Sequence, residues 1–179
     1  RSGSNQTSNA PLVERQAAAR KEVAALTTDG TLDTNKVFTG DNALANAATE
    51  VLDAVHPISE RHNVEIGGRL VADGEGVSYG APVVGTEGSV RINARGAIGA
   101  YHTHPGGAAY SIFSNQHTNS GRGGDAGFVE RYNIPLFMSN QVDGQINISV
   151  CSPGSARCRT DFDPRLYGID RGISGTPVR

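Results

Sequence analysis

The sequence contains no tryptophan, and aromatic residues make up only 6% of its 179 residues. A chain of this length is still long enough to bury one core. With so little aromatic material, that core must consist mostly of Val, Ile, Leu and Ala. Glycine is abundant, with 23 residues, which indicates many turns. We therefore expect one domain with a modest core and many turns.

An excess of charge of either sign is also missing, as are long apolar runs. Lys and Arg total 16 and Asp and Glu 18, for a formal charge of −2. This balance argues against recognition of nucleic acid or of a membrane surface through bulk charge. No apolar run is long enough to cross a bilayer, and no secretory signal stands at the start. We expect no nucleic-acid and no membrane partner.

Cysteine is scarce, and its two copies lie close together, as Cys151 and Cys158 in VCSPGSARC. Two cysteines are too few for a disulfide framework, and they lack the C-x-x-C spacing of a zinc knuckle. Two interpretations stay open from the sequence. Either both thiols are reduced, or they form a small disulfide loop, which would imply an oxidising compartment at some stage.

Three segments of the chain differ in composition and in the periodicity of their apolar residues. Residues 1–10 read RSGSNQTSNA and are interpreted as a flexible lead-in or a cloning scar, so the chain is expected to derive from a longer protein. Residues 11–151 carry the periodic patterns of a domain with N-terminal helices, and 152–179 are expected to form an irregular tail.

Helices are expected over 11–26, with Pro11 in the first helical position, and over 41–55, capped by Asp41 or Thr39 and ended by Pro57. A short helix is expected over 125–132, after a polar, glycine-rich loop. Strands are expected over 63–71, 77–85, 89–93, 97–104, 134–140 and 146–150. The fold class is therefore α/β, a mixed and mainly antiparallel sheet flanked by helices.

The strongest chemical signal is His102-Thr103-His104-Pro105, at the end of an expected strand. Residues i and i+2 of a strand point to the same side, so His102 and His104 direct both imidazoles at one point. Imidazole suits zinc. An isolated pair of strand histidines often has no function, so the weight of this motif depends on its companions.

Two carboxylates qualify as companions. Asp125 follows glycines at an expected helix start, where a carboxylate can cap the helix, bind a metal, or do both. Glu65 lies beside Gly67 and Gly68, which permit close approach of a backbone or a substrate. If its neighbours face the core, however, Glu65 is a solvated strand residue. Three ligands and one open position are typical of catalytic zinc, whose water a nearby carboxylate would deprotonate.

These residues resemble the JAB/MPN (JAMM) zinc metallopeptidase family over roughly residues 50–150. Glu65 in EIGGRL resembles its E-x-x-G-x-L glutamate, His102 to Pro105 match H-[ST]-H-P, and Asp125 with AGFVERYNIPLF resembles its aspartate, short helix and strand. The lead-in PISERHNVEIGG is similar to uncharacterised bacterial JAB-like domains found at the ends of secreted Rhs-type and other polymorphic toxins.

The resemblance implies a JAB/MPN-like fold, related to cytidine deaminases. It also implies Zn²⁺ held by His102, His104 and Asp125, with Glu65 as the catalytic carboxylate. The expected function is hydrolysis of peptide or isopeptide bonds in a protein or peptide substrate. The chain would be the toxic effector domain of a secreted bacterial protein delivered into a target cell, with a cognate immunity protein as a partner.

The family has serine three residues before its aspartate, in S-x-x-D, and here Arg122 stands in that place. That serine stabilises the oxyanion. We assign the role to Ser120, with Ser114 as the alternative, although neither has the family spacing. A second alignment makes Ser114 the S-x-x-D serine and His117 the third ligand. We prefer Asp125, because the sequence after it continues the family pattern.

Other interpretations remain. A JAB-like domain without catalysis would be a protein-binding module, and the same chemistry would serve a hydrolase of cell-wall peptide cross-links. A deaminase is disfavoured because P-C-x-x-C is missing. Glu60 and Glu87 are reserve carboxylates, His56 is interpreted as a helix-end cap, and His62 is expected on the surface.

Overall fold

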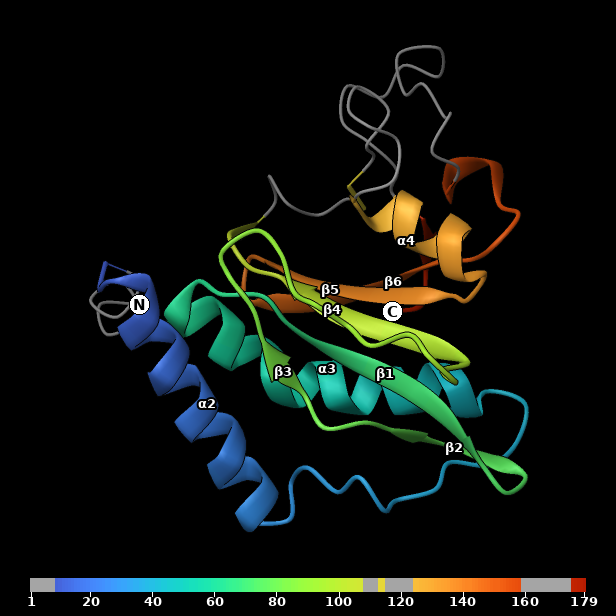
Figure 1. The fold of residues 1–179 in the computed structure, drawn as a ribbon, viewed down its shortest axis with the longest axis horizontal. Helices are drawn as coiled ribbons and strands as arrows, with labels where there is room; N and C mark the ends of the chain where they lie inside the picture. The colour runs from blue at the N-terminus through green and yellow to red at the C-terminus, as the bar shows by residue number, and fades with distance from the viewer. Residues whose placement is uncertain (1–8, 108–112, 115–123, 159–174) are drawn as a thin grey trace.

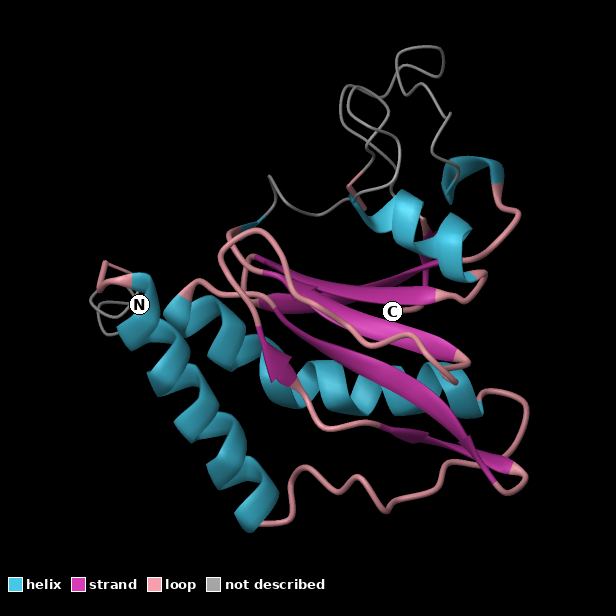
Figure 2. Ribbon diagram, viewed as in Figure 1, coloured by secondary structure: helices cyan, strands magenta, loops and turns pink. Residues whose placement is uncertain are grey.

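The computed structural model describes residues 9–107, 113–114, 124–158 and 175–179. These residues form a seven-stranded sheet with helices on both faces (Figures 1 and 2). The strand order is β2-β1-β4-β5-β6-β7, and β3 pairs with β1 off this path. Every pairing is antiparallel except that of β4 with β5. The expected mixed α/β architecture with a mainly antiparallel sheet is confirmed.

The elements have the following bounds. The helices are α2 (Leu12–Thr28), α3 (Ala43–His62), α4 (Gly124–Tyr132) and the short 3₁₀ helix η3 (Ala156–Cys158). The strands are β1 (Ile66–Asp73), β2 (Gly76–Tyr79), β3 (Val83–Val84), β4 (Gly99–His104), β5 (Leu136–Val142), β6 (Gln145–Cys151) and β7 (Thr176–Pro177). Within the described part of the chain, no helix combines the length and the apolarity that crossing a bilayer requires.

The expected helix ends were partly wrong. Pro11 precedes α2 as its N-cap, and α3 starts at Ala43 after Asn42, so neither Asp41 nor Thr39 caps it. The helix α3 also continues through Pro57 to His62. Proline removes one helical hydrogen bond, but the flanking turns of α3 are buried against the sheet, and such packing dominates helix stability.

Two strand expectations also needed correction. Residues 89–93 form no strand. The side of β1 that faces away from β4 is already paired with β3 and β2, so it offers them no free edge. An alternating pattern without a neighbouring strand has no ladder to join. The tail, expected to be irregular, includes β7, which pairs with β6. An open edge such as that of β6 offers unpaired backbone groups to any extended segment.

The two faces of the sheet carry different layers. The helix α3 lies along one face, and α4 lies over the other (Figure 1). Along β4, Tyr101 joins the core under α3, whereas Ala100 joins the smaller core under α4. Side chains alternate along a strand, so His102 and His104 share the α4 face with Ala100. The sheet therefore places both histidines under the helix that begins next to Asp125.

The parallel pairing of β4 with β5 determines where α4 lies. Parallel neighbours cannot be joined by a tight turn and need a crossover connection. Here the chain between His104 and Leu136 makes that crossover and contains α4. The crossover brings the start of α4 back over the end of β4, and with it Asp125.

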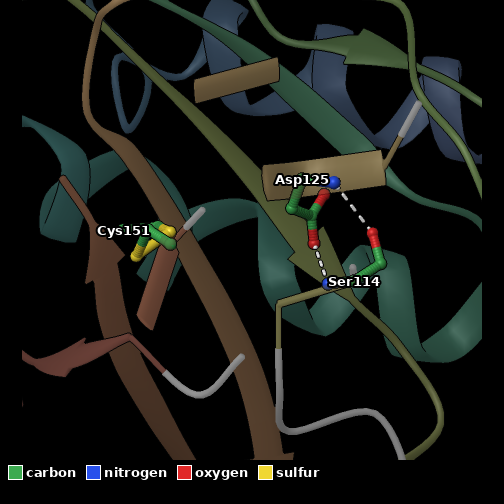
Figure 3. The surroundings of a disulfide bond; sticks show 4 residues. Ser114, Asp125 and Cys151 are labelled. Atoms are coloured by element: carbon green, nitrogen blue, oxygen red, sulfur yellow. Dashed lines mark hydrogen bonds between the residues drawn. A yellow bond between two sulfur atoms is a disulfide. The ribbon is translucent and has the colours of Figure 1, made fainter. Parts of the chain in front are cut away.

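Cys151 and Cys158 form a disulfide, so the interpretation as two reduced thiols was wrong. Cys151 ends β6 and Cys158 ends η3, and both are buried in the core under α4. Figure 3 shows this bridge near the start of α4. The disulfide attaches the segment after β6 to the sheet.

Reduction of this disulfide should destabilise the domain. The bridge closes a loop between cysteines seven positions apart, and the chain-entropy model assigns such a loop about 2–3 kcal/mol. Urea unfolding of the native protein and of a Cys151→Ala, Cys158→Ala variant should differ by about this free energy. Thiol titration of the unreduced protein in denaturant checks the premise, and two reactive thiols there would contradict it.

Candidate metal centre

His102 and His104 meet at their ring tips under α4. Their Nε2 atoms lie 2.9 Å apart, and the rings meet edge to face. Both residues are buried, with 3% and 8% of their surface exposed. The Nδ1 atom of His102 lies 3.3 Å from the carbonyl oxygen of Phe137. A hydrogen bond from this nitrogen would leave Nε2 of His102 free to bind a metal.

Glu65 joins the same group from the residue before β1. Val64 and Ile66 on either side are fully buried in the core, so the Glu65 side chain points the other way. It is only 8% exposed, which rules out the solvated strand residue considered from the sequence. One ligand atom from each of Glu65, His102 and His104 lies within 4.8 Å of the others.

Gly67 and Gly68 allow β1 to lie this close to β4. A Cβ atom on Gly67 would come 2.7 Å from the carbonyl oxygen of Tyr101 and 3.1 Å from Cβ of His102. On the other face, a Cβ on Gly68 would fall 2.4 Å from the hydroxyl of Tyr101. The register pairs Gly67 with His102, and its continuation by two residues brings Glu65 opposite His104.

Asp125 completes the cluster from the start of α4. Its Oδ1 lies 3.0 Å from Nε2 of His102, and its Oδ2 lies 3.2 Å from Nε2 of His104. The side chain is 13% exposed. The four side chains singled out from the sequence therefore converge at one place, although they come from three separate segments.

Ser114 holds Asp125 by a reciprocal pair of hydrogen bonds (Figure 3). The Ser114 amide donates to Oδ2 of Asp125 at 2.8 Å, and the Asp125 amide donates to Oγ of Ser114 at 2.9 Å. This is the pattern of a capping box, which ordinarily joins residues three positions apart. Here eleven positions separate the two residues, so the family spacing did not predict the pairing of Ser114 with Asp125.

Ser120, assigned from the sequence as a catalytic residue, lies outside the described residues, as do Arg122 and His117. Among the described residues, Ser114 is the serine bonded to Asp125. Ser114 was the alternative to Ser120 considered from the sequence. Its pairing with Asp125 was not predicted, because eleven positions rather than three separate the two residues.

Thr103, between the two histidines, points to the opposite face and connects the motif to α3. Its hydroxyl lies 2.6 Å from Oγ of Ser59 and accepts a hydrogen bond from the amide of Ile66 at 2.9 Å. Ser59 in turn donates to the carbonyl oxygen of Val64 at 2.6 Å. These bonds attach both sides of Glu65 to the strand that carries the histidines.

Neither reserve carboxylate belongs to the cluster. Glu60 accepts from the amide of Gly106 at 3.2 Å, and Glu87 pairs with Arg15. The expected helix-end role of His56 was wrong, because α3 continues past it and its Nδ1 lies 2.6 Å from Oγ of Ser139. His62 was expected on the surface but is 3% exposed, because α2 covers it and Glu22 pairs with it.

Burial and mutual charge shift the pKa values of the cluster. Burial raises the pKa of Glu65 above its ordinary value, although the charges of His102 and His104 oppose this. Burial alone would lower the pKa of His102, but the charge and hydrogen bond of Asp125 raise it to about 9. Burial opposes ionisation of Asp125 as well, yet the two histidines hold its pKa well below the ordinary value.

The metal-free protein should lose stability as the pH rises from 6.5 to 9. A histidine whose pKa is raised on folding stabilises fully below its unfolded pKa of 6.5, and this contribution disappears as the pH passes its folded value of about 9. The loss should be about 1–3 kcal/mol, measured by urea unfolding in EDTA. Asp125→Asn should flatten the profile, whereas constant stability of the parent protein over this range would contradict the pairing.

Comparison of the chain with protein-family models, curated proteins and solved structures found no match. The function of the cluster must therefore be inferred from its geometry, its chemistry and the sequence motifs that carry it.

Proposed function

We propose that this protein is a zinc-dependent hydrolase of peptide or isopeptide bonds, of the JAB/MPN (JAMM) type. The observation that carries the proposal is the buried group of Glu65, His102 and His104, together with Asp125, whose carboxylate lies against both histidines. Burying charged groups is costly. Two imidazoles and two carboxylates that come together in a protein interior therefore usually bind a metal or take part in a reaction.

His102, His104 and Asp125 are the ligands that we assign to the metal. Two nitrogen donors and one carboxylate suit zinc, and three protein ligands leave a position for water and substrate. The carboxylate oxygens of Asp125 already lie 3.0 and 3.2 Å from the two Nε2 atoms, so the donors need little rearrangement. When bound, zinc would polarise a carbonyl group and lower the pKa of a bound water.

Glu65 could instead be a metal ligand, because its carboxylate lies within the same 4.8 Å group as the histidines. We assign it the proton-transfer role, since Asp125 is bonded to both histidines and Glu65 is not. Burial raises the pKa of Glu65, which brings a carboxylate closer to the pKa range of a general base. Ser114, next to Asp125, has a hydroxyl group that can donate to a developing oxyanion.

We propose further that the α/β fold is specifically of the JAB/MPN type. It is supported by the order of the site along the chain, with Glu65 before β1, the histidines ending β4 and Asp125 starting α4. The effector role rests on the sequence similarity to toxin-borne domains. The buried disulfide supports a secreted protein, because such bonds persist in oxidising compartments. A cognate immunity protein is the partner proposed with that role.

A metal-binding module without catalysis is the second candidate. The long insertion between Ser114 and Asp125 favours it, because the family spacing is lost. The reciprocal hydrogen bonds between these residues oppose it, since they restore the contact despite the insertion. Variants of Glu65 distinguish the two candidates, because only the hydrolase requires a basic carboxylate there.

Zinc should bind in a ratio of about one ion per chain. His102→Ala and His104→Ala should each abolish this binding, because two of three ligands cannot hold a catalytic zinc. Elemental analysis after gel filtration provides the measurement. His56→Ala is the matched control, since His56 is buried beside Ser139 rather than in the cluster. Unchanged zinc content in both cluster variants would disprove the assignment.

Glu65→Gln should keep zinc and the fold while reducing hydrolysis by about 10²–10⁴-fold, the usual contribution of general acid–base catalysis. The measurement is the appearance of new peptide termini in a target-cell lysate, followed by mass spectrometry. Growth of cells expressing the domain gives a second measurement, because the same variant should relieve any toxicity. Glu75→Gln, in an exposed turn, is the control. Equal activity of the Glu65 variant would favour the binding module.

A further inference from the structure

Asn140 lies beside His104 on the site face of the sheet. It belongs to β5, and the parallel register pairs it with His104. Met138 and Leu136, two and four positions earlier, belong to the core under α4, so alternation along the strand places Asn140 on that same face. Adjacent strands lie roughly 4.8 Å apart. On the other side of β4, Glu65 is the residue just before β1, the strand that pairs with β4.

The amide nitrogen of Asn140 is buried without a hydrogen-bond partner among the described residues. The whole residue is only 3% exposed. Its neighbours on the opposite face do not share this state, since Ser139 bonds to His56 and Thr103 bonds to Ser59. A buried donor left unsatisfied costs about 1–3 kcal/mol, so an acceptor is expected from outside the described residues, and a bound molecule can supply it.

We propose that the Asn140 amide donates a hydrogen bond to the carbonyl oxygen of the substrate at the metal centre. This inference rests on the proposed function. The side-chain amide of asparagine carries two donors, and it recurs in sites that stabilise an oxyanion. Asn140 on β5 and Glu65 before β1 lie on the two sides of β4. Each can therefore reach a different oxygen atom of the reaction, the water oxygen or the carbonyl oxygen of the substrate. Glu65 serves the attacking water, and Asn140 serves the carbonyl oxygen.

In the reaction, the water oxygen forms a bond to the carbonyl carbon and its proton passes to Glu65. The π electron pair of the C=O bond moves onto the oxygen, which becomes a stronger acceptor for the Asn140 amide. The C=O bond then forms again as the C–N bond breaks, and Glu65 returns the proton to the leaving nitrogen. The hydrogen bond from Asn140 is therefore stronger in the transition state than in the bound substrate.

The test uses acetohydroxamate as a carbonyl probe and cobalt(II) as a coloured replacement for zinc. Cobalt is titrated first, and acetohydroxamate is then titrated into the cobalt-loaded protein while the visible spectrum is recorded. Asn140→Leu keeps the approximate size of the side chain and removes its donor. We expect unchanged cobalt affinity and hydroxamate affinity about 10-fold weaker or more, the effect of one hydrogen bond to a charged group.

Asn147→Leu is the matched control, because Asn147 pairs with Asn140 on the neighbouring strand β6 and lies farther from the histidines. It should bind hydroxamate like the parent protein. If Asn140→Leu does not fold, Asn140→Ala replaces it, with thermal unfolding as the check. A purely structural role for Asn140 would weaken cobalt binding and stability together and leave the hydroxamate affinity of the loaded protein unchanged.

The possible failures are distinguishable. A parent protein that binds no cobalt overturns the proposed function, and this inference with it. A parent protein that binds cobalt but no hydroxamate, or Asn140 variants that bind hydroxamate as tightly as the parent, overturn the inference alone. Selective loss of hydroxamate binding in the Asn140 variants, with Asn147→Leu unchanged, supports it.

Discussion

The close antiparallel pairing of β1 with β4 is the constraint on which the candidate site depends. Gly67 faces His102 across this pair, and a side chain there would collide with the Tyr101 backbone and with His102. Because the two strands can approach fully, the residue before β1 arrives opposite the second histidine. Without this approach, Glu65 would lie away from the two histidines, and the cluster would be reduced to His102, His104 and Asp125.

Polar contacts on both faces of β4 maintain this arrangement. Under α3, the hydroxyl groups of Thr103 and Ser59 bind each other and the backbone on either side of Glu65. Over the other face, Ser114 fixes the start of α4 and the carboxylate of Asp125. Fully satisfied buried networks specify one geometry, so the side chains of the cluster are held from two directions before any ligand binds.

This geometry has an energetic cost that a purely structural role does not explain. Burial disfavours the charged forms of Glu65, His102 and Asp125. It raises the pKa of Glu65, whereas the attraction between His102 and Asp125 raises the pKa of His102 and lowers that of Asp125. Compared with apolar side chains of similar volume, buried charge pairs contribute little net stability, since desolvation offsets the attraction, although breaking a pair that is already buried is costly. The unsatisfied amide of Asn140 adds to the cost. Such local costs are typical of sites maintained for binding or catalysis.

The sequence by itself determined the features that depend on local periodicity. The spacing of His102 and His104 set both imidazoles on one side of a strand, and the glycines before Asp125 marked a helix start. The main helices and most strands followed from the same patterns. The sequence could not decide whether Glu65 is solvated or belongs to the site. Its neighbours Val64 and Ile66 face the core, and the answer depended on whether the opposite face is covered as well.

Only the tertiary structure decided the features that require contacts between distant segments. The continuation of α3 through Pro57 depends on packing against the sheet, and the pairing of β7 depends on the open edge of β6. The contact of Ser114 with Asp125 joins residues eleven positions apart, and the position of Asn140 beside His104 follows from the parallel register. Local propensity carries no information about these contacts, because the free energy that selects them is gained only when the layers assemble.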